Sequence, residues 1–150
     1  MYLLDTNVLS EMRKVRRRRT DARFCAWAAT LEPATAWVSA ITIHEIEFDI
    51  SRLERRDPPQ AVLLRRWFAE EVMTAFSTRI LPVDGVVAIA AADLRVPDPA
   101  PIADSLIAAT ALVHGLTVAT RNAADFRRVG VDVLNPWEFP LPPPPGDEIS

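Results

Sequence analysis

The chain opens with Met1-Tyr2-Leu3-Leu4-Asp5-Thr6-Asn7, a short apolar run that ends in a carboxylate and two polar residues. The run predicts a buried strand at 2–4, and the polar residues predict a turn into a helix. Parallel α/β sheets place their ligand sites at the carboxyl ends of strands. We therefore expect Asp5 to lie at such an edge, although it can also simply cap the helix that follows.

The rest of the chain repeats this alternation of short apolar runs and helical patterns. We expect strands at 2–4, 37–38, 80–83, 116–119 and 131–134. Helices are predicted at 7–14, 21–31, 41–55, 58–77, 84–94 and 101–114, with a short helical turn at 122–126. Asp57-Pro58-Pro59 separates the predicted helix at 41–55 from the one at 58–77, so these two helices should form a hairpin. Such alternation is typical of an α/β fold with a parallel sheet and right-handed crossovers.

Size and composition favour a single globular domain. The chain has 150 residues, a net charge of −3 and a hydrophobic share of 49%. We place the domain at 1–139 and expect a flexible proline-rich tail at 140–150. No apolar run approaches the roughly 18 residues that span a bilayer, and the first residues predict a core strand rather than a signal peptide. We therefore expect a cytoplasmic protein with no membrane association, and the single Cys25 excludes an internal disulfide.

Glu45 is a second candidate site residue, and two local roles are open to it. Thr42-Ile43-His44-Glu45 fits a capping box, in which the glutamate bonds back to the N–H of the cap residue. Ser39 can instead cap the same helix one turn earlier, which would leave Glu45 available to a site. Spacing alone does not separate these roles.

Asp104 is a third candidate, in the first turn of a predicted helix that begins near Pro101. The helix dipole alone favours a carboxylate there. However, the helix is apolar on most of its faces, which predicts that it is buried. An unpaired carboxylate at the edge of the core is costly, and a bound cation removes that cost. Separated acids that converge form an oxygen-rich pocket, the type preferred by Mg²⁺ and Mn²⁺.

Four segments, which together cover about residues 1–137, carry a resemblance to a known family. They are Leu3-Leu4-Asp5-Thr6-Asn7-Val8-Leu9-Ser10, Ser39-Ala40-Ile41-Thr42-Ile43-His44-Glu45-Ile46, Ile102-Ala103-Asp104-Ser105-Leu106-Ile107-Ala108 and Ala119-Thr120-Arg121-Asn122-Ala123-Ala124-Asp125-Phe126. In this order they resemble the segments of PIN-domain nucleases, and most closely those of the VapC-like toxins of toxin–antitoxin pairs. The resemblance implies a three-layer α/β/α sandwich with a central parallel sheet of about five strands.

The resemblance also implies the site residues. Asp5, Glu45, Asp104 and Asp125 would be the catalytic and metal-binding acids. Asn7, Thr120 and Asn122 would be supporting polar residues. The family often has an acid where this chain has Asn122, so either Asn122 or Asp125 can complete the pocket.

The implied activity is that of an endoribonuclease toxin in which a Mg²⁺-activated or Mn²⁺-activated water hydrolyses RNA phosphodiester bonds. The implied partners are an RNA substrate, a cognate antitoxin and a second copy of the chain, with promoter DNA bound only through the antitoxin. The hairpin at 41–77 is the candidate surface for the antitoxin.

A basic run follows the first predicted helix: Arg13, Lys14, Arg16, Arg17, Arg18 and Arg19. Six cations within seven residues can contact RNA phosphates. A solvated loop in an arginine-rich protein is an equally good interpretation.

Two other functions remain open. One is a catalytically silent PIN-fold binding module, which the joint presence of Asp5, Glu45 and Asp104 argues against. The other is a different acid-metal phosphohydrolase, such as a phosphatase of the haloacid dehalogenase type. That type needs a second aspartate where this chain has Asn7, and it needs a downstream lysine, whereas Lys14 is the only lysine.

Overall fold

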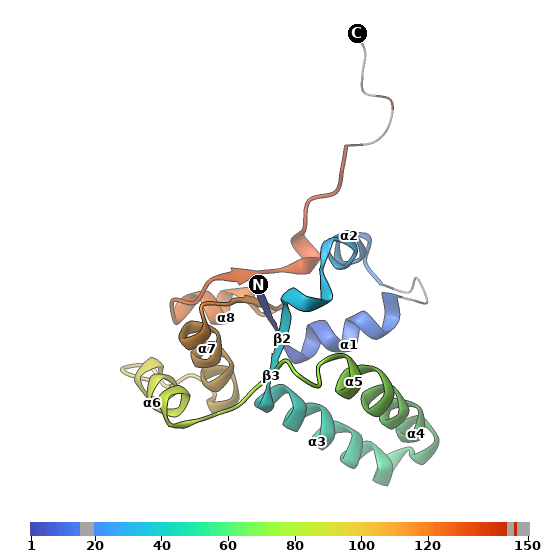
Figure 1. Cartoon of the computed structure of the whole chain (residues 1–150), viewed down its shortest axis with the longest axis horizontal. Coiled ribbons are helices and arrows are strands. Elements are labelled where there is room, and N and C mark those ends of the chain that lie inside the picture. Colours follow the sequence, from blue (N-terminus) through green and yellow to red (C-terminus); the bar gives the residue numbers. More distant parts are fainter. Residues whose placement is uncertain (16–19, 144–145, 147–150) are drawn as a thin grey trace.

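The computed structural model describes residues 1–15, 20–143 and 146. A parallel sheet runs through the molecule in the strand order β3-β2-β1-β4-β5 (Figure 1). Its five strands are β1 (Tyr2–Leu4), β2 (Ala36–Ser39), β3 (Ile80–Leu81), β4 (Thr117–Ala119) and β5 (Val133–Leu134). The parallel sheet predicted from the alternating pattern is confirmed.

Helices connect the strands and cover both faces of the sheet. They are α1 (Thr6–Val15), α2 (Ala22–Thr30), α3 (Ala40–Arg56), α4 (Pro58–Trp67), α5 (Met73–Ala75), α6 (Gly85–Leu94), α7 (Ile102–His114) and α8 (Ala123–Arg128). Two 3₁₀ turns, Pro33–Thr35 and Pro136–Glu138, precede β2 and follow β5. The predicted helix at 58–77 is interrupted, because a π-helical turn at Phe68–Val72 separates α4 from α5.

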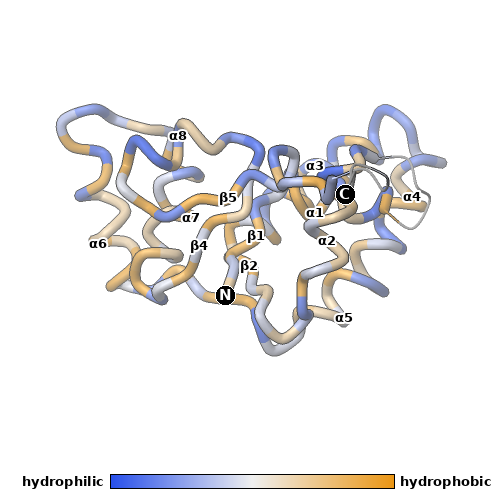
Figure 2. Tube along the Cα trace, turned by 90° about the horizontal axis from the view of Figure 1, so that it is seen from above, coloured by the Kyte–Doolittle hydropathy of each residue, from blue (hydrophilic) through white to orange (hydrophobic). Residues whose placement is uncertain are grey.

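Alternate residues of each strand pack into different cores. Leu4 and Val38 point into a core built with α1, α2, α3 and the α4–α5 region, whereas Leu3 and Val118 point into one built with α7 and α8. Figure 2 shows the strands between α6, α7 and α8 on one side and the remaining helices on the other. A sheet buried on both faces needs apolar residues at consecutive positions, as at Leu3 and Leu4. The three-layer α/β/α sandwich is confirmed.

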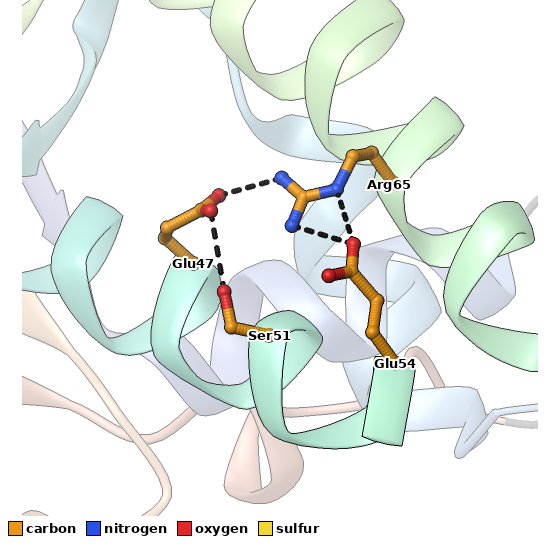
Figure 3. A network of polar contacts seen from close by, with 4 residues as sticks. All are labelled: Glu47, Ser51, Glu54 and Arg65. Atoms are coloured by element: carbon orange, nitrogen blue, oxygen red, sulfur yellow. Dashed lines mark hydrogen bonds and ion pairs between the residues drawn. The ribbon is translucent and has the colours of Figure 1, made fainter. Parts of the chain in front are cut away.

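The predicted helical hairpin is formed by α3 and α4. Asp57 ends α3 and also begins α4, where its carboxylate accepts a hydrogen bond from the Gln60 N–H at 3.4 Å. Arg65 of α4 bridges two acids of α3, with Nη1 at 2.8 Å from Glu47 and Nε at 2.9 Å from Glu54 (Figure 3). These exposed contacts link α4 to α3.

The order of the strands determines where a site can form. The chain passes from β1 to β2 and β3 on one side, then returns through α6 and α7 to β4 on the other side of β1. The chain therefore adds strands on one side of β1 first and on the other side later, which makes the gap between β1 and β4 the switch point of the sheet. The carboxyl ends of these two strands are adjacent because Leu4 pairs with Ala119. Ligands of open α/β sheets bind at such a switch point.

The ends of the chain add little to this core. Residues 140–143 form neither helix nor strand and lead away from the sheet (Figure 1), while 144–145 and 147–150 of the predicted tail lie outside the described residues. No helix of the described residues combines the length and apolarity needed to cross a membrane.

Candidate active site

Asp5 lies at the switch point, directly after β1, and only 5% of it is exposed. Its Oδ1 accepts a hydrogen bond from the Thr6 N–H at 2.8 Å. Its Oδ2 accepts from the Thr120 hydroxyl at 2.8 Å and from Asn7 Nδ2 at 3.3 Å. Each of these donors is neutral, so the carboxylate is held in place without a compensating positive charge.

Thr120 and Asn7 link the ends of β1 and β4 around Asp5. The Thr120 oxygen accepts from Asn7 Nδ2 at 3.4 Å and from the Asn122 N–H at 3.0 Å. Asn7 Oδ1 accepts from the Arg121 N–H at 3.2 Å. Thr120 and Asn7 therefore contact Asp5 directly, whereas Asn122 reaches this network through its backbone.

Glu45 lies in the second turn of α3 and is half-buried. The helix begins at Ala40, and the Ser39 hydroxyl caps it by accepting from the Ile41 N–H at 3.0 Å. The capping-box alternative is wrong, because Thr42 lies inside the helix rather than at its cap position. Glu45 therefore does not take part in a capping box, in agreement with the prediction in which Ser39 caps the helix.

Asp104 and Asp125 lie in the first turns of α7 and α8. Asp104 is partly buried, whereas the side chain of Asp125 is 61% exposed and its Oδ1 lies 3.6 Å from Nη2 of Arg128. The hydroxyl of neighbouring Ser105 donates to the Pro101 carbonyl at 2.9 Å.

The acids are close enough to affect one another's ionisation. Burial raises the pKa of Asp5, and its three hydrogen bonds partly offset this. Burial and then the charge of Asp5 raise the pKa of Glu45, to which Asp104 and Asp49 also contribute. Burial raises the pKa of Asp104, followed by the charges of Asp5 and Asp125. Three elements of the fold thus bring mutually repelling carboxylates into one region.

The carboxylates do not form a closed metal cage. Across residues 1–15, 20–143 and 146, no three His, Cys, Asp or Glu side chains lie close enough together to hold one ion. The donors are all oxygens, which suits a hard divalent cation. Thr6 Oγ1 is also buried, and its interaction with Glu45 lowers the pKa of that carboxyl by favouring the charged form. The residues fit such a cation chemically, provided that the side chains turn toward one another.

Two polar residues near the acids are missed by the sequence analysis. Thr6 is one of them, and its position beside Asp5 was the available signal. The other is Arg121, between Thr120 and Asn122, whose guanidinium carbon lies 5.0 Å from the centre of the Trp137 ring. Trp137 follows β5, and sequence gives no indication that it reaches Arg121.

The predicted basic run is only partly described. Arg13 and Lys14 lie in the last turn of α1, and Lys14 Nζ pairs with Glu11 at 3.4 Å. Arg16, Arg17, Arg18 and Arg19 lie outside the described residues. A phosphate-binding role for this run stays a prediction.

Known proteins resemble this chain over nearly its whole length. The PIN domain family matches residues 2–132. The chain is 34% identical to the VapC ribonuclease Y4jK of Sinorhizobium fredii over 143 residues, which cover 92% of this chain and 99% of that protein. It is 36% identical to the toxin FitB of Neisseria gonorrhoeae over 142 residues, which cover 91% and 99%.

A solved structure supports the same assignment. FitAB bound to an IR36 DNA fragment contains a chain that is 34% identical, with a TM-score of 0.82 over 94% of this chain and 99% of that one. The sequence matches and the structural match thus cover the same part of the chain. The chain belongs to the PIN domain family, and its relatives include VapC and FitB proteins.

Proposed function

We propose that the protein is a metal-dependent endoribonuclease that acts as the toxin of a toxin–antitoxin pair. Asp5, Glu45 and Asp104 would hold Mg²⁺ or Mn²⁺, with Asp125 or Asn122 completing the pocket. The proposal rests on one observation. Asp5 lies close enough to raise the pKa of Glu45 and of Asp104, yet none of the ion pairs among the described residues involves any of these three acids.

Because Asp5, Glu45 and Asp104 form no ion pair among the described residues, a role in binding a ligand is favoured over a purely structural role. Acids that serve only the fold are normally paired when they are buried. Here the neutral donors of Thr6, Asn7 and Thr120 orient Asp5 and leave the repulsion among the acids in place. A bound divalent cation relieves that repulsion, acidifies a water and screens the incoming phosphate.

RNA is the proposed substrate, because a relative aligned along almost the whole chain is named a ribonuclease. Arg121 is well placed to contact the RNA backbone, since its N–H joins the Asp5 network through Asn7. Stacking on Trp137 restricts the guanidinium, which lowers the entropy lost on binding a phosphate. Arg13 and Lys14 could extend the same electrostatic contact.

The proposed protein partner is an antitoxin that docks on the α3–α4 hairpin. Phe48 of α3 and Val62 and Leu63 of α4 are each more than half exposed, at 53%, 58% and 55%. Exposed apolar side chains on neighbouring helices suit a partner helix. A chain similar to this one occurs in FitAB bound to an IR36 DNA fragment, and we propose that this protein reaches promoter DNA only through its antitoxin. We also propose a homodimer, as the resemblance implies.

Cleavage of mixed RNA by the purified, antitoxin-free chain tests the activity. It should require Mg²⁺ or Mn²⁺ and stop with chelator. Asp5→Asn and Asp104→Asn should each reduce it by roughly 100-fold or more, since removing even outer-shell partners of a metal costs 10–100-fold.

Asp132→Asn is the matched control, because Asp132 is an exposed acid outside the site. Cleavage that survives chelator, or that is equal in the wild type and both site variants, would contradict the proposal. RNA binding without cleavage under any metal would support the silent binding module instead.

A further inference from the structure

A cavity of about 520 Å³ opens beside the proposed metal site. It lies between the end of α6, the loop at 95–101 and the first turns of α7 and α8, and Figure 2 shows these three helices together at one end of the molecule. Asp104 and Asp125 form part of its wall. An RNA strand whose phosphate sits at these acids would therefore place a neighbouring nucleotide at the opening.

Apolar side chains also line the cavity, and the loop beside it is held in shape. Leu94, Phe126 and Val129 are among the lining residues. Arg95 Nε donates to the Ala100 carbonyl at 2.8 Å, which closes the loop on itself. Apolar side chains beside a fixed loop suit a ring-shaped ligand, and pockets for small ligands have volumes of about 300–1,000 Å³.

The polar groups that line the cavity select for hydrogen-bond donors. Four of them are carboxylates, namely Asp93, Asp98, Asp104 and Asp125, and the guanidinium among them, Arg128, already lies 3.6 Å from Asp125. Ionised carboxylates only accept hydrogen bonds. The interior therefore disfavours a phosphate and favours an uncharged ring that carries N–H groups.

We propose that this cavity binds the nucleobase next to the cleaved phosphodiester, and that it prefers guanine to uracil. This inference rests on the proposed ribonuclease activity. Asp104 and Asp125 belong to the proposed metal site, which leaves Asp93 and Asp98 to contact the base. Guanine offers adjacent N1–H and N2–H donors that match one carboxylate with two hydrogen bonds. Uracil offers a single N–H between two carbonyl oxygens, which the carboxylates repel.

Sequencing the cut ends of a randomised RNA pool tests the preference. We expect guanine to be enriched at one fixed position beside the cut, and Asp98→Asn to reduce that enrichment by about tenfold, the scale of one base-edge contact. Cleavage beside guanine should fall by the same factor, whereas cleavage beside the other bases should change little. Asp132→Asn again serves as the control and should leave the enrichment unchanged.

A binding measurement separates this inference from the ribonuclease proposal. Equilibrium dialysis with GMP and UMP should show binding of GMP that Asp98→Asn weakens, whether or not the protein cleaves RNA. Unchanged guanine enrichment in Asp98→Asn, or a preference for uracil, would overturn the inference. So would an Asp98→Asn variant with wild-type base preference but weakened antitoxin binding, because the cavity would then bind a basic side chain of the partner.

Discussion

Thr120→Val tests whether one hydroxyl holds Asp5 in position. Valine keeps the shape and β-branch of threonine but removes the oxygen that donates to Asp5 Oδ2 at 2.8 Å and accepts from the Asn122 N–H. Both Thr120 and Asp5 are buried, at 0% and 5% exposure, so water does not replace the lost donor freely. Loss of this hydrogen bond should therefore lower the free energy of unfolding.

The expected loss of stability is about 1.5–2 kcal/mol, because hydrogen bonds to charged groups contribute about 1.5–3 kcal/mol. The lower half of that range applies here, since Asp5 keeps its contacts with the Thr6 N–H and Asn7 Nδ2. Urea unfolding followed by tryptophan fluorescence, without metal and at about pH 7, measures the loss. The same substitution in an Asp5→Asn background isolates the contribution of the charge.

The pH dependence has a definite sign. Burial raises the pKa of Asp5, and the Thr120 hydroxyl lowers it by favouring the ionised carboxylate. The stability that this hydroxyl contributes is therefore present at neutral pH and is lost as the pH falls through the pKa of folded Asp5. A coupling energy between the two sites below about 0.5 kcal/mol, or an equal loss at low and neutral pH, would refute the reasoning.

Two further changes test the hairpin and the proposed RNA contact. Arg65→Met should cost less than about 1 kcal/mol in unfolding free energy, and the loss should vanish in high salt, because the contacts of Arg65 with Glu47 and Glu54 are exposed. A larger or salt-independent loss would contradict this. Arg121→Ala should weaken RNA binding and reduce the slope of log affinity against log salt by about 0.7, the value for one phosphate contact on a single strand. Arg127→Ala is its control, and equal effects of the two variants would exclude a specific role for Arg121.

The elements of the fold were predictable because their signals are local. Apolar runs at Leu3–Leu4 mark a strand buried on both faces, and Gly115 ends α7 with a φ of 67°, a conformation that glycine adopts without strain. The π-helical turn at Phe68–Val72 was not predicted, because the apolar pattern of 58–77 continues through it. Such a turn depends on how the helix packs rather than on its own residues.

The site was predictable in its residues but not in its contacts. Asp5 and Thr120 are 115 positions apart, and only the pairing of Leu4 with Ala119 brings them within 2.8 Å. The same holds for Arg121 and Trp137, which meet because β4 pairs with β5. A sequence shows which residues end each strand, whereas strand order and register decide which of those ends are neighbours.

The charge of Asp5 raises the pKa of Glu45 and of Asp104, yet the three carboxylates do not form a cage. Without a cation, the like charges of Asp5, Glu45 and Asp104 favour conformations in which the side chains stay apart. Thr6, Asn7 and Thr120 hold Asp5 in place through neutral hydrogen bonds. The fold thus holds the Asp5 carboxylate in place and keeps the negative charges of Glu45 and Asp104 near it, which is unfavourable without a cation. Residues that destabilise a fold in this way are expected at a functional site, because a ligand that cancels their charge binds all the more tightly.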